Sequence, residues 1–128
     1  MARRESIYIA DFPHANPVPA ACRIDNMLYS GVLYGRDPQT RLVPADLNEQ
    51  CALMFRHVVT LVTAAGGSPD DIIKITLWMA DKHQRTVVNR HWEALFPDPK
   101  TRPARHTLPG VFEGTMLIQC DFVAVLPG

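Results

Sequence analysis

The stretch Ala64-Ala65-Gly66-Gly67-Ser68-Pro69-Asp70-Asp71-Ile72-Ile73-Lys74 marks the passage from a predicted helix to a predicted strand. Gly66-Gly67 adopts positive φ at low cost, which is a common way for a helix to end. Ser68 to Asp71 then predicts a single capped turn that leads into the strand. A long helix is therefore expected before residue 66, and a strand after residue 71.

The helix is predicted from Leu47 to Ala65. Asp46 and Glu49 have the spacing of a capping box, with aspartate in place of the usual serine or threonine. The helix has one apolar stripe, whose residues recur at helical spacing: Leu47, Cys51, Met54, Phe55, Val58, Val62 and Ala65.

The strand after the turn is predicted from Ile72 to Met79, with Ile73, Ile75, Leu77 and Met79 on one face and Lys74 and Thr76 on the other. A second helix is predicted from about Gln84 to Phe96, with Asp81 as its cap. Gly31 indicates a bulge or a close backbone approach within its strand. The remaining strands are expected at Ser6–Ile9, Ala21–Ile24, Met27–Tyr34, Ala104–Leu108 and Thr115–Val125.

This order, β-β-β-α-β-α-β-β, predicts an α+β fold in which two helices pack on one face of a single sheet. The 128 residues suit one domain, residues 1–128. The second sheet face is expected to be half apolar, and such a face in a small domain usually needs a partner subunit. Its apolar residues are Ile72, Trp78, Leu117, Val123 and Val125.

Charge and composition argue against several classes of protein. Thirteen basic residues balance thirteen acidic ones, which gives no support to nucleic-acid binding. No apolar run is long enough for a signal peptide core or a membrane span, and three widely separated cysteines do not resemble a disulfide framework. We therefore expect a cytoplasmic protein that contacts neither nucleic acid nor membrane.

The five histidines are possible metal ligands by residue type. They show no HExxH motif and no paired cysteine spacing, so no metal site is expected. One is expected on the flank of the first helix, and two on the solvent side of the second. The histidines are His14, His57, His83, His91 and His106, of which His57 belongs to the first helix and His83 and His91 to the second.

Several segments, in order and at matching spacing, resemble the RidA/YjgF family (the endoribonuclease L-PSP superfamily) over nearly the whole chain. They are Asn26-Met27-Leu28-Tyr29-Ser30-Gly31, Ala64 to Lys74, Asn89 with Trp92 before Phe96, and Arg102-Pro103-Ala104-Arg105. The resemblance implies a chorismate-mutase-like fold and homotrimers with ligand clefts between subunits. It also implies cofactor-independent hydrolysis of 2-imino acids, such as 2-iminobutanoate, to 2-oxo acids and ammonia.

The resemblance also suggests which residues carry out this chemistry. Arg105 matches the arginine that binds the substrate carboxylate, a task suited to a planar guanidinium. Asp121 stands where the family usually has glutamate, which is thought to orient the attacking water. Five further positions are expected to bind substrate: Ser30, Gly31, Asn89, Thr107 and Val18.

The chain departs from the family pattern at several positions. Val18 replaces a tyrosine in the usual Pro-Tyr-Ser-Gln segment, Asp121 replaces glutamate, and His106 stands where small or apolar residues are usual. The substrate could therefore be another carboxylate, such as an aminomuconate-type enamine from aromatic breakdown. A non-catalytic small-anion binder or a redox-responsive chaperone is a further alternative. The neutral charge argues against a ribonuclease.

Strand alternation predicts that Arg105 and Thr107 share one sheet face. If the last two strands pair, Asp121 should lie on the strand next to Arg105 and face the same cleft. The alternative to a catalytic role is then a structural Arg105–Asp121 ion pair, since an unpaired buried charge is costly.

Overall fold

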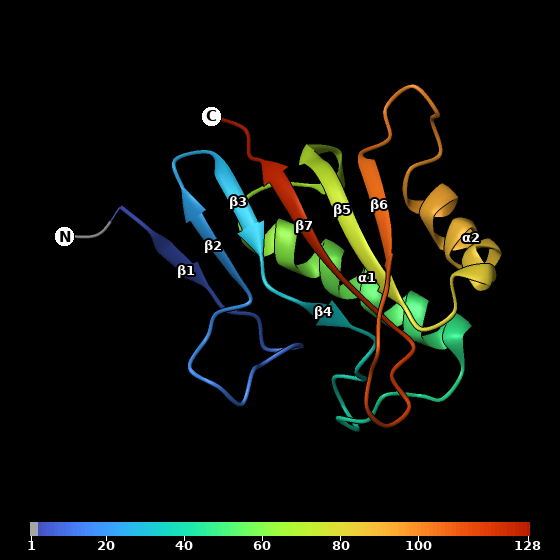
Figure 1. Cartoon of the computed structure of the whole chain (residues 1–128). Helices are drawn as coiled ribbons and strands as arrows, with labels where there is room; N and C mark the ends of the chain where they lie inside the picture. The colour runs from blue at the N-terminus through green and yellow to red at the C-terminus, as the bar shows by residue number, and fades with distance from the viewer. Residues whose placement is uncertain (1–2) are drawn as a thin grey trace.

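The computed structural model describes residues 3–128 and contains one mixed sheet and two α-helices (Figure 1). Short 3-10 turns, η1 and η2, precede β5 and α2. The elements in chain order are β1 (Glu5–Ile7), β2 (Ala21–Ile24), β3 (Met27–Ser30), β4 (Leu33–Tyr34), α1 (Leu47–Ala64), η1 (Pro69–Asp71), β5 (Ile72–Met79), η2 (Lys82–Gln84), α2 (Arg85–Leu95), β6 (Ala104–Pro109) and β7 (Ile118–Val125).

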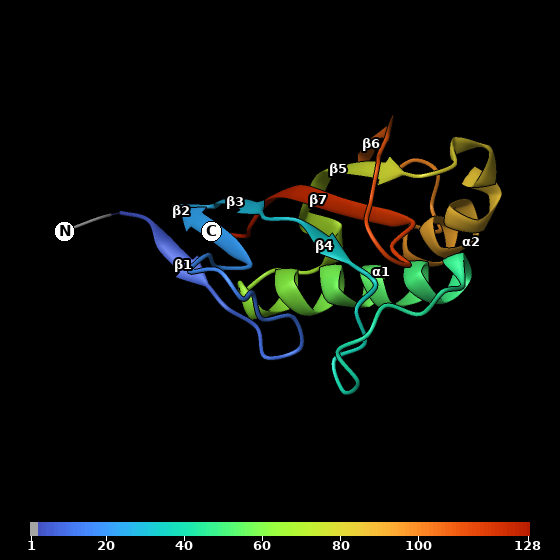
Figure 2. The same ribbon diagram turned by 60° about the horizontal axis from the view of Figure 1, so that its bottom comes forward.

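The strands are ordered β1-β2-β3-β7-β5-β6, and β4 also pairs with β7. Among the strand pairs formed by residues 3–128, only β5–β6 is parallel. Both helices lie on the same side of the sheet, with α2 beside α1 (Figure 2). The predicted α+β class and single sheet are confirmed. The expected pairing of the last two strands is wrong, because β5 lies between β6 and β7.

Helix α1 begins and ends where the sequence predicted, to within one residue. The carboxylate of Asp46 accepts a hydrogen bond from the backbone N–H of Glu49, at 3.0 Å. At the other end Gly66 has a φ of 95°, and the N–H of Gly67 donates to the carbonyl of Val62. The apolar stripe between these ends lies in the core, and Cys51, Met54 and Val58 are fully buried.

The alternation expected in β5 is broken by a bulge between Ile72 and Lys74. The extra residue turns Ile72 into the core and leaves Ile73 50% exposed, the reverse of the prediction. Leu117 also packs against the core rather than on the second face, because it precedes β7 instead of belonging to it. Trp78, Val123 and Val125 remain on the second face, as predicted.

A buried glutamine, Gln50, ties α1 to two loops. Its amide Nε2 donates to the carbonyls of Pro44 and Thr115, each at 2.7 Å, and its Oε1 accepts from the N–H of Leu117 at 2.8 Å. The backbone of Gly35 lies so close that a Cβ there would be 2.4 Å from the carbonyl oxygen of Gln50. The amphipathic pattern of α1 gave no sign of this polar contact.

Replacing Gln50 with leucine should destabilise the fold strongly. The substitution keeps the volume but leaves two part-buried carbonyls and one part-buried N–H without their partner, at a cost of about 2–4 kcal/mol in the free energy of unfolding. Urea unfolding measures it, and Gln39→Leu at an exposed position is the control. A loss below about 1 kcal/mol for Gln50→Leu would mean that water replaces these hydrogen bonds.

Candidate active site

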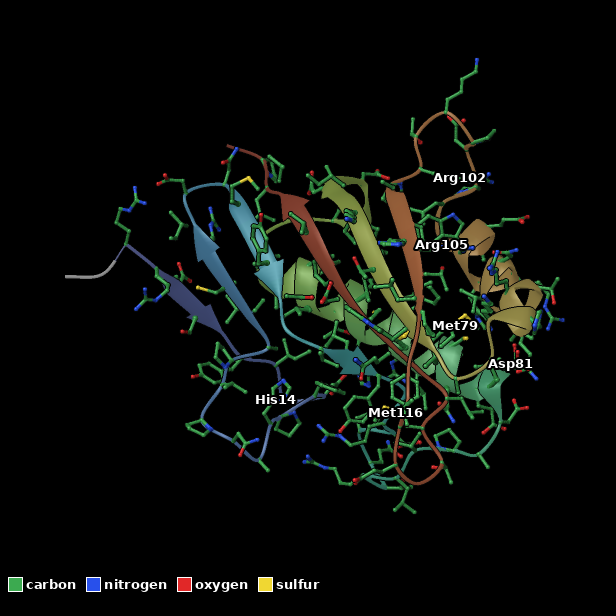
Figure 3. The ribbon with its side chains drawn as sticks, viewed as in Figure 1. His14, Met79, Asp81, Arg102, Arg105 and Met116 are labelled. Atoms are coloured by element: carbon green, nitrogen blue, oxygen red, sulfur yellow. The ribbon has the colours of Figure 1, made fainter. Side chains whose placement is uncertain are left out.

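Arg105 lies on the helix side of β6, which is an edge strand. The parallel register pairs Arg105 with Ile75 and Thr107 with Leu77, and both partners are fully buried against the helices. Arg105 and Thr107 therefore share one face, as predicted. Figure 3 shows Arg105 on the α2 side of β6.

The guanidinium of Arg105 rests on an aromatic ring instead of pairing with an acid. Its Cζ lies 5.1 Å from the ring centroid of Trp92 on α2. Burial, and then the charge of Arg85, lower the pKa of Arg105. No carboxylate of residues 3–128 contributes to that pKa in the opposite direction. An arginine remains charged at neutral pH, so this half-buried cation is available to an anion.

Asn89 belongs to the same side of α2. It precedes Trp92 by three residues, so the two side chains lie on one stripe of the helix. Asn89 is half-buried, as are Arg105 and Thr107. The fold thus brings three of the predicted site residues to the junction of α2 and β6. We call Arg105, Thr107, Asn89 and Trp92 the Arg105 site.

Asp121 does not belong to the Arg105 site of the same chain. It pairs with Thr76 in the β5–β7 ladder, whereas its neighbour Cys120 pairs with Leu77 and is fully buried. The Asp121 side chain therefore lies on the sheet face away from the helices, opposite to Arg105. The expected shared cleft is wrong within one chain, and so is the alternative of an intrachain Arg105–Asp121 ion pair. Burial raises the pKa of Asp121, and the charge of Lys74 offsets this in part.

Ser30, Gly31 and Val18 form a second group, near β2 and β3. The Ser30 hydroxyl accepts from the N–H of Phe122 and donates to the carbonyl of Gly31, both at 2.8 Å. The N–H of Gly31 donates to the carbonyl of Ala20 at 2.8 Å, in the break between β3 and β4. Val18 is exposed and lines a small hollow of about 120 Å³. The strands β7 and β5 separate this group from β6 (Figure 1).

Two histidines occupy positions other than those expected. His57 is fully buried, and its Nε2 lies 2.7 Å from the carbonyl of Arg36. Burial lowers the pKa of His57. His91 stacks on Phe55 and contacts the Asn48 side chain at 2.7 Å, so it lies between the helices. A stripe pattern shows which helix face meets the sheet, but not which residues a loop or another helix covers.

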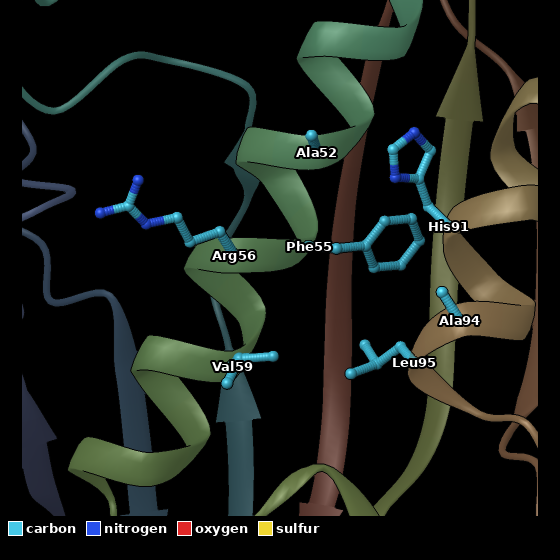
Figure 4. Close-up of a pocket in the computed structure, with 7 residues that line it drawn as sticks. All are labelled: Ala52, Phe55, Arg56, Val59, His91, Ala94 and Leu95. Carbon is cyan, nitrogen blue, oxygen red and sulfur yellow. The ribbon is translucent and has the colours of Figure 1, made fainter.

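A groove of about 270 Å³ between α1 and α2 lies apart from the Arg105 site (Figure 4). It contains none of the predicted site residues, and its lining is mostly apolar. The lining residues are Ala52, Phe55, Arg56, Val59, His91, Ala94 and Leu95. Within residues 3–128 no three His, Cys, Asp or Glu side chains are grouped to hold a metal, and no helix has the length and apolarity to cross a membrane.

Two features of the Arg105 site were not predicted from the sequence: the position of Arg85 and the second role of Trp92. The charge of Arg85 lowers the pKa of Arg105, and Trp92 supports the guanidinium as well as filling the core. The signal was present in the spacing, because residues 85, 89 and 92 follow one another on a single helical stripe.

Comparison with known proteins shows the family of this fold. The model of the endoribonuclease L-PSP family matches residues 9–112. The chain belongs to this family, which includes the RidA/YjgF proteins.

Several individual relatives are similar to the chain. The 2-iminobutanoate/2-iminopropanoate deaminase of Escherichia coli (strain K12) is 34% identical over 83 residues, 64% of this chain and 65% of that protein. TdcF of the same strain is 36% identical over 69 residues, 53% of this chain, and the match spans about half of the length of TdcF, 54%. A crystal structure of E. coli TdcF with bound serine superposes with a TM-score of 0.87 at 25% identity, covering 96% of this chain and 99% of that one.

The burial of His57 should make stability depend on pH. The pKa of His57 in the folded chain is below its unfolded value of about 6.5. As the pH falls, His57 is therefore protonated in the unfolded chain before it is protonated in the folded chain. The contribution of His57 is complete above that pH and is lost as the pH falls below it. The free energy of unfolding should fall less steeply between pH 7 and 5 in His57→Gln than in the wild type. The exposed variant His83→Gln should keep the wild-type slope. Equal slopes in all three would contradict a neutral buried His57.

Proposed function

We propose that this chain is a hydrolytic deaminase that converts imines or enamines of small carboxylates to oxo acids and ammonia. The observation that carries the proposal is the half-buried guanidinium of Arg105, which lies on Trp92 without an acidic partner among residues 3–128. Relatives named as imine deaminases support it, and so does the fold shared with TdcF, whose crystal structure contains serine, a carboxylate ligand.

The reaction needs few groups, because a C=N bond is already electrophilic. Arg105 would bind the substrate carboxylate through two parallel N–H donors. Asn89 and Thr107 would supply hydrogen bonds beside it. Water adds to the imine carbon, a proton moves to nitrogen, and the C–N bond of the resulting carbinolamine breaks to release ammonia. No cofactor takes part in this scheme.

Proton transfer in this scheme requires a second group, and Asp121 is the candidate. Burial raises the pKa of Asp121, which brings the carboxyl closer to the range useful for exchanging protons. Since Asp121 and Arg105 of one chain lie on opposite faces, we propose that they meet across subunits. The RidA/YjgF resemblance implies a homotrimer with such clefts. The exposed second face, where Tyr29 is 59% exposed near Val123 and Val125, suits burial in an interface.

Substitution of Arg105 tests the carboxylate contact. Arg105→Ala should lower kcat/KM for 2-iminobutanoate roughly thirty- to a thousandfold, since a charge-assisted contact is lost. This corresponds to a loss of about 2–4 kcal/mol of transition-state stabilisation. Arg105→Lys keeps the charge but not the planar fork and should recover little. Ammonia release from the imine, generated in the assay, is the measurement. Arg102→Ala is the matched control, because Arg102 donates to the carbonyl of Phe96 in the fold. Wild-type ammonia release by a folded Arg105→Ala protein would refute the proposal.

Mixed subunits test where Asp121 acts. Light scattering should first give a mass near 43 kDa, about three times that of the 14.3 kDa chain. Asp121→Asn alone should reduce turnover yet still bind a carboxylate product, because it cannot accept a proton. When Arg105→Ala and Asp121→Asn subunits are mixed by refolding, about a quarter of the sites should regain both groups. Absence of any regain, with trimers formed, would show that the two residues do not share a site across subunits.

A second candidate function is supported by the separation of Arg105 from Asp121. An anion site without a nearby proton acceptor is sufficient for a non-catalytic binder of small carboxylates. Calorimetric binding of 2-oxobutanoate without turnover of 2-iminobutanoate would favour this function.

A further inference from the structure

The two segments around Arg105 contain several basic residues and no acidic residue. The chain is neutral overall, with thirteen basic and thirteen acidic residues, yet residues 82–92 and 99–112 contain no aspartate or glutamate. These two segments include η2, most of α2 and all of β6, and η2 contacts β6. The Arg105 site thus lies where two acid-free segments meet.

Arg85 is a basic residue whose charge acts on the pKa of Arg105. It is the first residue of α2 and precedes Trp92 by seven positions. Seven residues are nearly two helical turns, so the two side chains project within about 20° of one another. The Cζ atom of Arg105 lies 5.1 Å from the ring centroid of Trp92. In sequence, Asn89 lies between Arg85 and Trp92 on the same helical stripe. Arg85 therefore extends the Arg105 site by a second cation.

Nothing within residues 3–128 is seen to balance this pair of charges. The charge of Arg85 lowers the pKa of Arg105, and no carboxylate of the described residues offsets this effect. The first turn of α2 contains no acidic residue, and the side chain of Gln84 makes no capping hydrogen bond there. The positive end of the helix dipole therefore adds to the two arginines. Two like charges held near one another without a counter-ion favour a ligand with two negative groups.

We infer that Arg85 binds a second acidic group of the substrate, so that the preferred substrates are imines or enamines of dicarboxylic acids. This inference rests on the proposed function for its chemistry, but the binding preference can be measured without turnover. One carboxylate would bind Arg105 beside the reacting carbon, and the distal one would bind Arg85. The exposed position of Arg85 leaves room for chains of different length.

Two four-carbon imines separate the number of carboxylates from the size of the substrate. 2-Iminosuccinate has two carboxylates and 2-iminobutanoate has one, and both can be generated in the assay from amino acids by an oxidase. Wild type should prefer 2-iminosuccinate in kcat/KM. Arg85→Gln should lower the ratio of the two kcat/KM values about ten- to a hundredfold, the range expected for one charge-assisted contact.

The matched control is Arg90→Gln. Arg90 is exposed on the same helix but about 140° around it from Arg85, so the ratio should stay within about twofold of wild type. An unchanged ratio in Arg85→Gln would overturn the inference. An equal drop in Arg85→Gln and Arg90→Gln would also overturn it, because it would reflect general charge and not a contact.

Binding of succinate and butanoate distinguishes this inference from the proposed function. In calorimetry, wild type should bind succinate about ten times more tightly than butanoate, and Arg85→Gln should lose that difference. If this result is obtained but neither imine is deaminated, the deaminase proposal fails and the two-cation site stands. If both imines are deaminated but succinate and butanoate bind equally, the deaminase proposal stands and the role of Arg85 is refuted.

Discussion

The register of β5 between β6 and β7 determines on which face each candidate residue lies. Ile75 pairs with Arg105 on one side and with Phe122 on the other, whereas Thr76 pairs with His106 and Asp121. Burial of Ile75 and Leu77 fixes this register, because a slip by one residue would bring Thr76 and Lys74 into the core. The hydrophobic core thus directs Arg105 and Thr107 toward the helices and Asp121 away from them.

Three other arginines are engaged in the fold, and Arg105 differs from them. Arg23 donates to the carbonyls of Asp25 and Ala65, and Arg102 donates to that of Phe96. Arg36 lies over the ring of Phe12 and donates to the hydroxyl of Tyr34. Arg105 has the support of Trp92, which offsets part of the cost of removing its guanidinium from water. Its N–H donors thus remain for an anionic ligand, and this makes Arg105 the best candidate for a binding residue.

Local features of the sequence predicted local structure well. The Asp46 cap and Gly66 located the ends of α1, and strand alternation put Arg105 and Thr107 on one face without knowledge of the topology. The error over Asp121 arose from pairing the last two strands, which are neighbours in sequence, whereas the parallel β5–β6 pair inserts β5 between them. The bulge at Ile72 and the burial of His57 were missed because both depend on segments distant in sequence. Contacts with distant segments do not appear in the local hydrophobic periodicity of a helix or a strand.

Because Arg105 and Asp121 of one chain lie apart, the proposed function would require oligomerisation to complete the active site. A carboxylate cannot reach Arg105 through the sheet, since β5 and its buried side chains lie between them. In the proposed trimer it would approach around the edge formed by β6, from another copy of the chain. That edge carries unpaired backbone groups, and the second sheet face carries exposed apolar side chains, so both gain from being covered. Burying them would stabilise the assembly and would in the same step bring a proton acceptor to the substrate, so an isolated chain would bind a carboxylate but lack the group that activates water.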